Sequence, residues 1–205
     1  LISAVCFQSL LNEQITNISS VSVIGLGYVG ITLFAAFSSH GFKTQGIDID
    51  QRKINKLRKG DYISDEPGVT EALKSAQVNG NVLFREPHEI ISTDVYVICV
   101  GTSLDENMNL DTLHMQSCLT SLSKVLKAGQ QVHLRSTVPV GFTNKMREKY
   151  NSQNIYFSPE FLREGNALLD NLMPSRIIVG GNTQEAKNFA KLLLNCVEKN
   201  KNQVP

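Results

Sequence analysis

Six residues with three glycines set the strongest constraint on the fold of this chain. Gly25-Leu26-Gly27-Tyr28-Val29-Gly30 has the spacing GxGxxG, between the β-branched run Val21–Ile24 and the mostly apolar stretch Tyr28–Ser39. Between a strand and a helix, this spacing is typical of a dinucleotide-binding turn, whose phosphates lie on the free N–H groups of the helix. The first glycine permits the tight turn, the second lets the pyrophosphate approach, and the third lets the helix pack closely. The residues expected at the cofactor are Gly25, Gly27, Tyr28, Val29 and Gly30.

An acidic residue at the end of the next predicted strand indicates which dinucleotide would bind. A carboxylate at Asp48 would accept hydrogen bonds from the adenosine ribose hydroxyls and repel a 2′-phosphate, so the sequence favours NAD over NADP. Asp50 is the rival residue, but it lies beyond the strand and could instead cap the following helix. A purely structural turn without a ligand is the remaining alternative.

The rest of the chain alternates between strand and helix patterns. Strands are predicted at Val21–Ile24, Lys43–Asp48, Asn81–Phe84, Asp94–Val100, Gln131–Leu134, Ile155–Phe157 and Arg176–Val179. Helices are predicted at Ile2–Ile15, Tyr28–Ser39, Gln51–Arg58, Val69–Gln77, Asp111–Leu126, Thr143–Tyr150 and Gln184–Val197. The nearly all-apolar Asp94–Val100 is typical of a central parallel strand. This order predicts an α/β protein with a Rossmann-type doubly wound parallel sheet and helices on both faces.

Charge and composition exclude several other classes of protein. Lys and Arg number 20 and Asp and Glu number 19, so nothing favours the capture of nucleic acid. No segment is apolar over the length of a membrane span. Cysteines and histidines lack the spacing of a metal site or a disulfide framework; they are Cys6, Cys99, Cys118, Cys196, His40, His88, His114 and His133. We therefore expect a cytoplasmic protein without metal, nucleic-acid or membrane partners.

The predicted organisation has two parts. Residues 1–20 begin with Leu1 rather than Met and form an N-terminal tail of uncertain origin. Residues 21–205 form the NAD-binding Rossmann domain. At this length the chain accommodates one doubly wound sheet.

Seven segments stand in the order found in a known family. They are VIGLGYVG (Val23–Gly30), GIDID (Gly46–Asp50), EPG (Glu66–Gly68), CVGTS (Cys99–Ser103), STVPVG (Ser136–Gly141), SPEFLREGNALLDN (Ser158–Asn171) and PSRIIVG (Pro174–Gly180). On these segments the chain resembles the N-terminal NAD-binding domain of the UDP-glucose/GDP-mannose dehydrogenase family. STVPVG and SPEFLREG are the segments most specific to this family. The sequence around SPEFLREG and PSRIIVG is most similar to the UDP-glucose 6-dehydrogenase branch.

The resemblance implies a reaction and its participants. Enzymes of this family oxidise C6 of a nucleotide sugar twice, from alcohol to acid, and reduce two NAD. A cysteine holds the intermediate as a thiohemiacetal and then as a thioester, which water hydrolyses. The implied cofactor is NAD, and the implied substrate is a nucleotide sugar, with UDP-glucose preferred.

The resemblance also assigns roles to residues of this chain. Thr137 matches a threonine that helps to hold water and substrate near C6. Glu160 matches the glutamate that acts as acid and base in thioester hydrolysis. Glu164 matches a second glutamate, which lies near both the substrate and the nicotinamide. Implied substrate contacts come from Glu160, Phe161, Leu162, Arg163 and Glu164. Further implied cofactor contacts come from Lys53, Val100, Gly101, Thr102, Ser136, Thr137 and Glu164.

The physical character of these loops agrees with the assignment. Gly101–Ser103 and Ser136-Thr137 follow two predicted strands, and ligands of open α/β sheets bind outside such carboxyl ends. If a helix begins near Glu160, then Glu160 and Glu164 share a face and split their pKa values, so one could be a general base near neutral pH. The alternative is that Thr137 merely caps a turn and Glu160 a helix start.

Two parts of the family pattern are absent from the sequence. One is the glycine-rich GG-x-CFPKD segment with the nucleophilic cysteine, in the C-terminal UDP-binding domain. The other is the central helix through which full-length members form dimers. We therefore expect a fragment that holds the cofactor domain and part of the substrate site, is inactive alone, and could be monomeric.

Several alternatives stay open. The sugar nucleotide could be GDP-mannose or a UDP-N-acetylhexosamine, because Ser103-Leu104 stands where the family often has a proline and the following DENMNLD is similar to the GDP-mannose branch. The chain could instead be a non-catalytic NAD-sensing or interaction module. Dehydrogenases of the 6-phosphogluconate or 3-hydroxyacyl-CoA type share the Rossmann half but offer no match to SPEFLREG.

Overall fold

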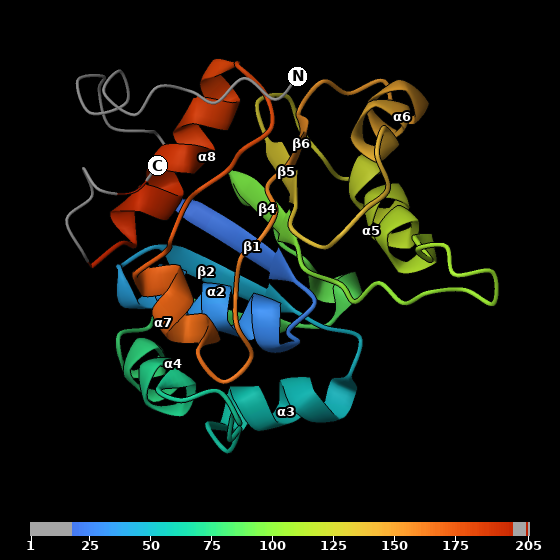
Figure 1. Ribbon diagram of the computed structural model, residues 1–205. Coiled ribbons are helices and arrows are strands. Elements are labelled where there is room, and N and C mark those ends of the chain that lie inside the picture. Colours follow the sequence, from blue (N-terminus) through green and yellow to red (C-terminus); the bar gives the residue numbers. More distant parts are fainter. Residues whose placement is uncertain (1–17, 199–203, 205) are drawn as a thin grey trace.

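The computed structural model describes residues 18–198 and 204, and within them a parallel sheet carries helices on both faces (Figure 1). Its strands run in the order β3-β2-β1-β4-β5-β6. They are β1 Ser20–Ile24, β2 Lys43–Ile47, β3 Val82–Arg85, β4 Val95–Ile98, β5 Gln131–Leu134 and β6 Ile155–Phe157. The helices are α2 Tyr28–Ser39, α3 Gln51–Lys59, α4 Val69–Val78, the 3-10 helix η1 Pro87–Glu89, α5 Leu113–Ser123, α6 Phe142–Lys149, α7 Ala167–Leu172 and α8 Gln184–Asn195. The predicted α/β doubly wound fold is confirmed.

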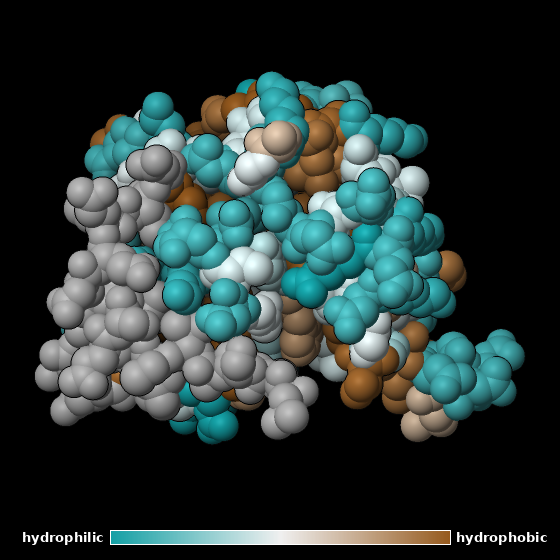
Figure 2. All heavy atoms as spheres, turned by 90° about the horizontal axis from the view of Figure 1, so that it is seen from above, coloured by the Kyte–Doolittle hydropathy of each residue, from teal (hydrophilic) through white to brown (hydrophobic). Residues whose placement is uncertain are grey.

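Two hydrophobic clusters form the interior, one on each face of the sheet. Side chains of β4 alternate between them: Val95 and Val97 pack with α2, α4 and α8, whereas Tyr96 and Ile98 pack with α5 and α6. All four are essentially buried, which explains why this strand is apolar without interruption. Seen from above, the described surface is mainly hydrophilic with separate hydrophobic patches (Figure 2). None of the helices described is long and apolar enough to cross a membrane.

The strand order reverses between β1 and β4, and this reversal positions the candidate site. The chain leaves β1 toward β2 on one side, while β4 pairs with β1 on the other. The glycine turn follows β1, and the Cys99–Ser103 segment follows β4. The N–H of Cys99 donates to the carbonyl of Ile24 at 2.7 Å, so the two loops start side by side. In open α/β sheets, ligands bind at such a switch point.

One predicted strand is wrong. Arg176–Val179 is irregular, although its side chains are those of a strand. Beside it, the N–H of Gly180 donates to the carbonyl of Phe157 at 2.7 Å, but no ladder extends from there. Pro159 has no N–H to donate and follows closely on the short strand β6, so there is little strand left to pair with.

Other differences concern element ends. The helix predicted over Asp111–Leu126 begins at Leu113, because the carboxylate of Asp111 accepts the N–H of Leu113 at 2.8 Å and holds the chain in a turn. The short helix α7 was not predicted. The helix predicted over Ile2–Ile15 lies outside the described residues.

Candidate functional site

The glycine turn packs directly against its neighbours. Gly25 has a φ of 88°, and a Cβ there would lie 2.9 Å from the backbone between Cys99 and Val100. A Cβ on Gly30 would collide with the carbonyl oxygen of Gly25 and lie 3.2 Å from Cβ of Cys99. The first turn of α2 therefore rests on the turn and on the end of β4.

Gly27 faces open space. A Cβ there would meet nothing within 4 Å. Gly27 is also the N-cap of α2, and no described side chain caps this helix, whereas Asp50 caps α3 and Thr183 caps α8. The free N–H groups of the first turn and the positive end of the helix dipole fit a pyrophosphate.

Asp48 borders the same turn. Its Oδ2 accepts the N–H of Leu26 at 2.8 Å, and its Oδ1 accepts the N–H of Asp50 at 2.9 Å. Burial raises the pKa of Asp48, but these hydrogen bonds and Lys53 outweigh it, so the pKa lies below its ordinary value. The side chain of Asp50 accepts the N–H groups of Arg52 and Lys53 instead. Asp48, rather than Asp50, is therefore the acid at the turn.

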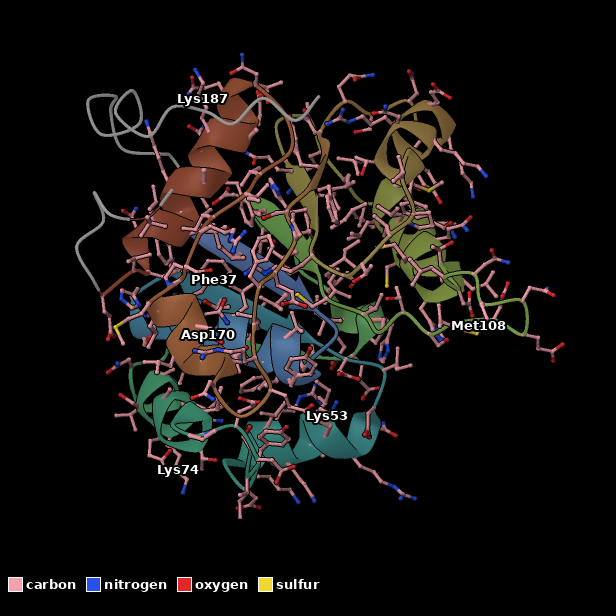
Figure 3. All side chains as sticks on the ribbon, in the orientation of Figure 1. Phe37, Lys53, Lys74, Met108, Asp170 and Lys187 are labelled. Atoms are coloured by element: carbon pink, nitrogen blue, oxygen red, sulfur yellow. The ribbon has the colours of Figure 1, made fainter. Side chains whose placement is uncertain are left out.

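Lys53 ties α3 to the turn (Figure 3). Its Nζ lies 3.2 Å from Oδ2 of Asp48 and 3.2 Å from the carbonyl oxygen of Leu26. The ammonium group is partly exposed, so it remains accessible to a ligand at this edge of the sheet.

The loops after β4 and β5 lie beside the glycine turn, at the carboxyl ends of the central strands. The hydroxyl of Ser136 donates to the carbonyl of Val100 at 2.6 Å and joins their starts. Gly101 is exposed, and Thr102 is half-buried. Thr137 is exposed and makes no side-chain hydrogen bond to the described residues, so the structure gives no support to a turn-capping role.

The Glu160–Glu164 segment does not form the helix that would place both carboxylates on one face. Pro159 precedes it, and Gly165, with a φ of 79°, forms a turn before α7 begins at Ala167. Oε2 of Glu160 accepts the N–H of Leu162 at 2.7 Å, which caps a local turn rather than a helix start. The expected shared helical face is wrong.

The segment that contains the two glutamates lies near the start of α2. Its continuation α7 packs on α2, where Nδ2 of Asn171 donates to Oγ1 of Thr32 at 3.1 Å. Tyr28 stands on the first turn of α2, beside the glycine turn. Burial raises the pKa of Tyr28, and the charges of Glu160, Glu164 and Glu66 raise it further, so these carboxylates act on the same end of α2.

Two other predicted substrate residues use their side chains within the protein. Arg163 donates from its N–H, Nε and Nη2 to the carboxylate of Asp170 at 2.8, 3.1 and 2.7 Å (Figure 3 labels Asp170). The ring of Phe161 lies 4.8 Å from the guanidinium of Arg176. These contacts shape the segment and leave the Glu164 side chain exposed.

Glu66 also contacts the Glu160–Glu164 segment, although the sequence predicts no role for it beyond its place in the EPG segment of the family pattern. Its buried carboxylate accepts the N–H groups of Gly165 and Ala167 at 2.9 and 3.0 Å. No spacing rule could have found contacts between residues so distant in the chain.

Neither Cys99 nor Cys118 is an activated thiol. Burial raises the pKa of Cys99 to about 12, and burial also raises the pKa of Cys118. Within the described part of the chain, no group of three or more His, Cys, Asp or Glu side chains could hold a metal ion. Cys6 lies outside the described residues.

Comparison with known proteins identifies relatives of this domain. The profile of the UDP-glucose/GDP-mannose dehydrogenase family, NAD binding domain, matches residues 19–197. A UDP-glucose 6-dehydrogenase from Campylobacter jejuni is 34% identical over 87% of this chain and 46% of its own length. A UDP-N-acetyl-D-mannosamine dehydrogenase from Methanococcus aeolicus is 31% identical over 89% of this chain and 43% of its own length.

A solved structure agrees with the sequence comparison. The UDP-glucose dehydrogenase from the hyperthermophilic archaeon Pyrobaculum islandicum superposes with a TM-score of 0.80 at 30% identity, over 89% of this chain and 45% of that one. The chain thus spans less than half the length of these relatives.

Proposed function

The chain belongs to the UDP-glucose/GDP-mannose dehydrogenase family, and we propose that it supplies the cofactor half of a nucleotide-sugar dehydrogenase that acts on UDP-glucose. NAD is the cofactor of this domain. The single observation that carries the proposal is the packing of α7, which continues the Glu160–Glu164 segment, on α2, the helix that begins at the glycine turn.

The cofactor is assigned to the carboxyl ends of β1 and β4, where the strand order reverses. The N–H groups at the start of α2 would bind the pyrophosphate, and Gly27 leaves the space for it. Asp48 would accept the adenosine ribose hydroxyls, and Lys53 would lie near the adenosine. Val100, Gly101, Thr102 and Ser136 would line the opposite wall. When bound, NAD supplies the hydride acceptor.

The acid–base work is assigned to the Glu160–Glu164 segment. Glu160 would move the proton of a hydrolytic water, and Thr137 would hold that water and the substrate. Glu164 would contact both the sugar and the nicotinamide. The backbone of Phe161–Arg163 would meet the nucleotide sugar. Glu164 makes no side-chain hydrogen bond to the described residues, which leaves its carboxylate available for a ligand.

UDP-glucose is the preferred substrate in this proposal. The relative from Campylobacter jejuni and the solved structure from Pyrobaculum islandicum both bear the name of a UDP-glucose dehydrogenase. A UDP-N-acetylhexosamine is the second candidate, because a UDP-N-acetyl-D-mannosamine dehydrogenase is 31% identical.

Side-by-side calorimetric titration tests this proposal. UDP-glucose, UDP-N-acetylmannosamine and GDP-mannose are each added to the chain saturated with NAD. Tightest binding of UDP-glucose supports the proposal. Tightest binding of another sugar nucleotide would make that sugar nucleotide the assigned substrate. If none of the three binds, the proposed substrate site is contradicted. Binding of a sugar nucleotide separates the proposal from a non-catalytic NAD-sensing module, and NADH formation in the same mixtures would contradict the expectation that the chain is inactive alone.

A further inference from the structure

We propose that Glu66 is a positioning residue, whose buried carboxylate fixes the Glu164–Gly165 peptide and so sets the direction of the Glu164 side chain. The proposal deepens the proposed function, because it rests on that function for the role of Glu164. We call the two hydrogen bonds from the N–H groups of Gly165 and Ala167 to the Glu66 carboxylate the clamp. The clamp does not depend on the proposed function.

Glu66 is a buried acid in the loop before α4. Only 6% of the residue is exposed, and no described Lys or Arg forms a salt bridge with it. Its two carboxylate oxygens take separate donors: Oε1 accepts the N–H of Gly165 at 2.9 Å, and Oε2 accepts the N–H of Ala167 at 3.0 Å. A buried charge is stabilised in this way only if both donors stay in place.

Glu66 is itself held firmly. Its N–H donates to the hydroxyl of Ser64 at 3.2 Å, and its carbonyl accepts the N–H of Val69 at 3.3 Å as α4 begins. A Cβ on Gly68 would lie 3.2 Å from Cδ2 of Leu168, so the starts of α4 and α7 pack closely (Figure 1). Both helices pack on α2, so the clamp is built on the same helix that follows the glycine turn.

The clamp acts on the peptide that follows Glu164. The N–H of Gly165 belongs to the Glu164–Gly165 peptide plane, and its hydrogen bond to Glu66 fixes that plane. On the other side of Glu164, the N–H of Arg163 donates to Asp170 at 2.8 Å. The backbone is therefore held on both sides of Glu164, while its exposed side chain makes no hydrogen bond to the described residues.

Glycine at position 165 gives the turn the backbone freedom that a hydrogen bond can restrain. The residue has a φ of 79°, and glycine has the largest backbone freedom to lose on folding. The turn has one backbone hydrogen bond of its own, from the N–H of Asn166 to the carbonyl of Arg163 at 2.9 Å. The bond from Gly165 to Glu66 adds a restraint from outside the segment.

Amide hydrogen exchange of Glu66→Ala and Glu66→Gln tests the clamp directly. In Glu66→Ala we expect the amides of Gly165 and Ala167 to exchange at least roughly tenfold faster, as the loss of a hydrogen bond to a charged group implies. Glu66→Gln has one acceptor oxygen and an NH₂ group, so it should retain protection at one of the two amides. Unchanged exchange at both amides in Glu66→Ala overturns the proposal.

Two controls separate positioning from general destabilisation. Glu71→Gln removes the same charge from the first turn of α4, at an exposed site, and should leave both amides protected. Amides of β4 report global opening in every variant. If Glu66→Ala accelerates β4 as much as Gly165 and Ala167, Glu66 acts only on overall stability and the proposal is wrong.

A double-mutant cycle tests the link to Glu164. UDP-glucose affinity with NAD present is measured for Glu66→Gln, Glu164→Gln and the double variant. If Glu66 acts through Glu164, Glu66→Gln weakens binding alone but adds nothing to Glu164→Gln, whereas additive losses refute the link. If the unmodified chain binds no sugar nucleotide, the proposed function fails, and the exchange experiment still decides whether Glu66 clamps the turn.

Discussion

The carboxylate of Asp48 accepts a 2.8 Å hydrogen bond from the N–H of Leu26, inside the glycine turn. This contact connects the end of β2 to the turn after β1. Asp48, which would bind the adenosine ribose, therefore also stabilises the glycine turn, which would bind the pyrophosphate. Lys53 donates to both residues and completes a small network. The network restrains the loop at which the pyrophosphate would bind, which reduces the ordering that binding has to impose.

Replacing Asp48 by Asn should weaken NAD binding and reduce the ratio by which the chain binds NAD more tightly than NADP. The variant loses the negative charge that attracts ribose hydroxyls and repels a 2′-phosphate. We expect the Kd for NAD to rise about 10- to 100-fold, the range for a hydrogen bond to a charged group. Calorimetric titration with NAD and NADP measures both effects.

Asp50→Asn is the matched control for that experiment. Asn is as good an N-cap as Asp, so α3 should stay capped and NAD affinity should stay unchanged. A loss of NAD affinity in Asp50→Asn, with none in Asp48→Asn, would exchange the roles of the two acids.

Alanine substitutions at two glycines of the turn should have opposite consequences. Gly27→Ala adds a methyl group to open space, so the thermal stability should not change. NAD binding should weaken at least about tenfold, because the methyl group would keep the pyrophosphate away from the backbone. Gly30→Ala forces a methyl group against the carbonyl of Gly25 and should lower the free energy of unfolding by about 1–3 kcal/mol. Urea unfolding and NAD titration separate the two. Normal NAD binding by Gly27→Ala would argue against the phosphate site.

Stability should fall as pH drops below about 6.5, the ordinary pKa of histidine, because of His133. Its ring is fully buried between Phe189 and Tyr156, and Nδ1 has no hydrogen-bond partner among the described residues. Burial, and then the charge of Arg135, hold the pKa of His133 well below its ordinary value. The unfolded chain binds a proton there before the folded chain does, so acid favours unfolding.

Urea unfolding between pH 7.5 and 5.5 measures this loss. The slope from one group is at most about 1.4 kcal/mol per pH unit. In His133→Phe the free energy of unfolding should change less between pH 7.5 and 5.5 than in the unmodified chain, even if the variant is less stable at both pH values. The same slope in the variant and the unmodified chain would assign the effect to other groups.

Thiol labelling should distinguish the described cysteines by burial. Cys99 is buried with a pKa of about 12, and Cys196 is also buried, whereas Cys118 is partly exposed. Thiolate is the reactive form, so iodoacetamide at neutral pH should modify Cys118 first and reach Cys99 only on unfolding. Peptide mass spectrometry after timed labelling follows each site. Rapid labelling of Cys99 in the folded chain would show an accessible thiol at the end of β4.

The sequence predicted those parts of the fold that depend on local pattern. The apolar run before Val100 and the glycine spacing were sufficient for the central strands and the first crossover. Arg176–Val179 looks like a strand by composition, but strand formation requires a partner, and Pro159 leaves almost none. The short α7 depends on Glu66 for its first turn, a contact between segments about a hundred residues apart that no local pattern contains.

The candidate site shows the same division. Asp48 and the glycines were predicted from spacing, because the motif is local. Glu160 and Glu164 were predicted from the resemblance, and the helix on which their shared face depended does not form. The position of their segment near α2 depends on tertiary packing.

An NMR titration of the chain with NAD tests the central claim most directly. The account predicts saturable one-to-one binding, with the largest amide shifts at Leu26–Gly30 and further shifts at Asp48 and Gly101–Thr102. Absence of shifts at millimolar NAD, or shifts that bypass Leu26–Gly30, would contradict a cofactor site at this turn.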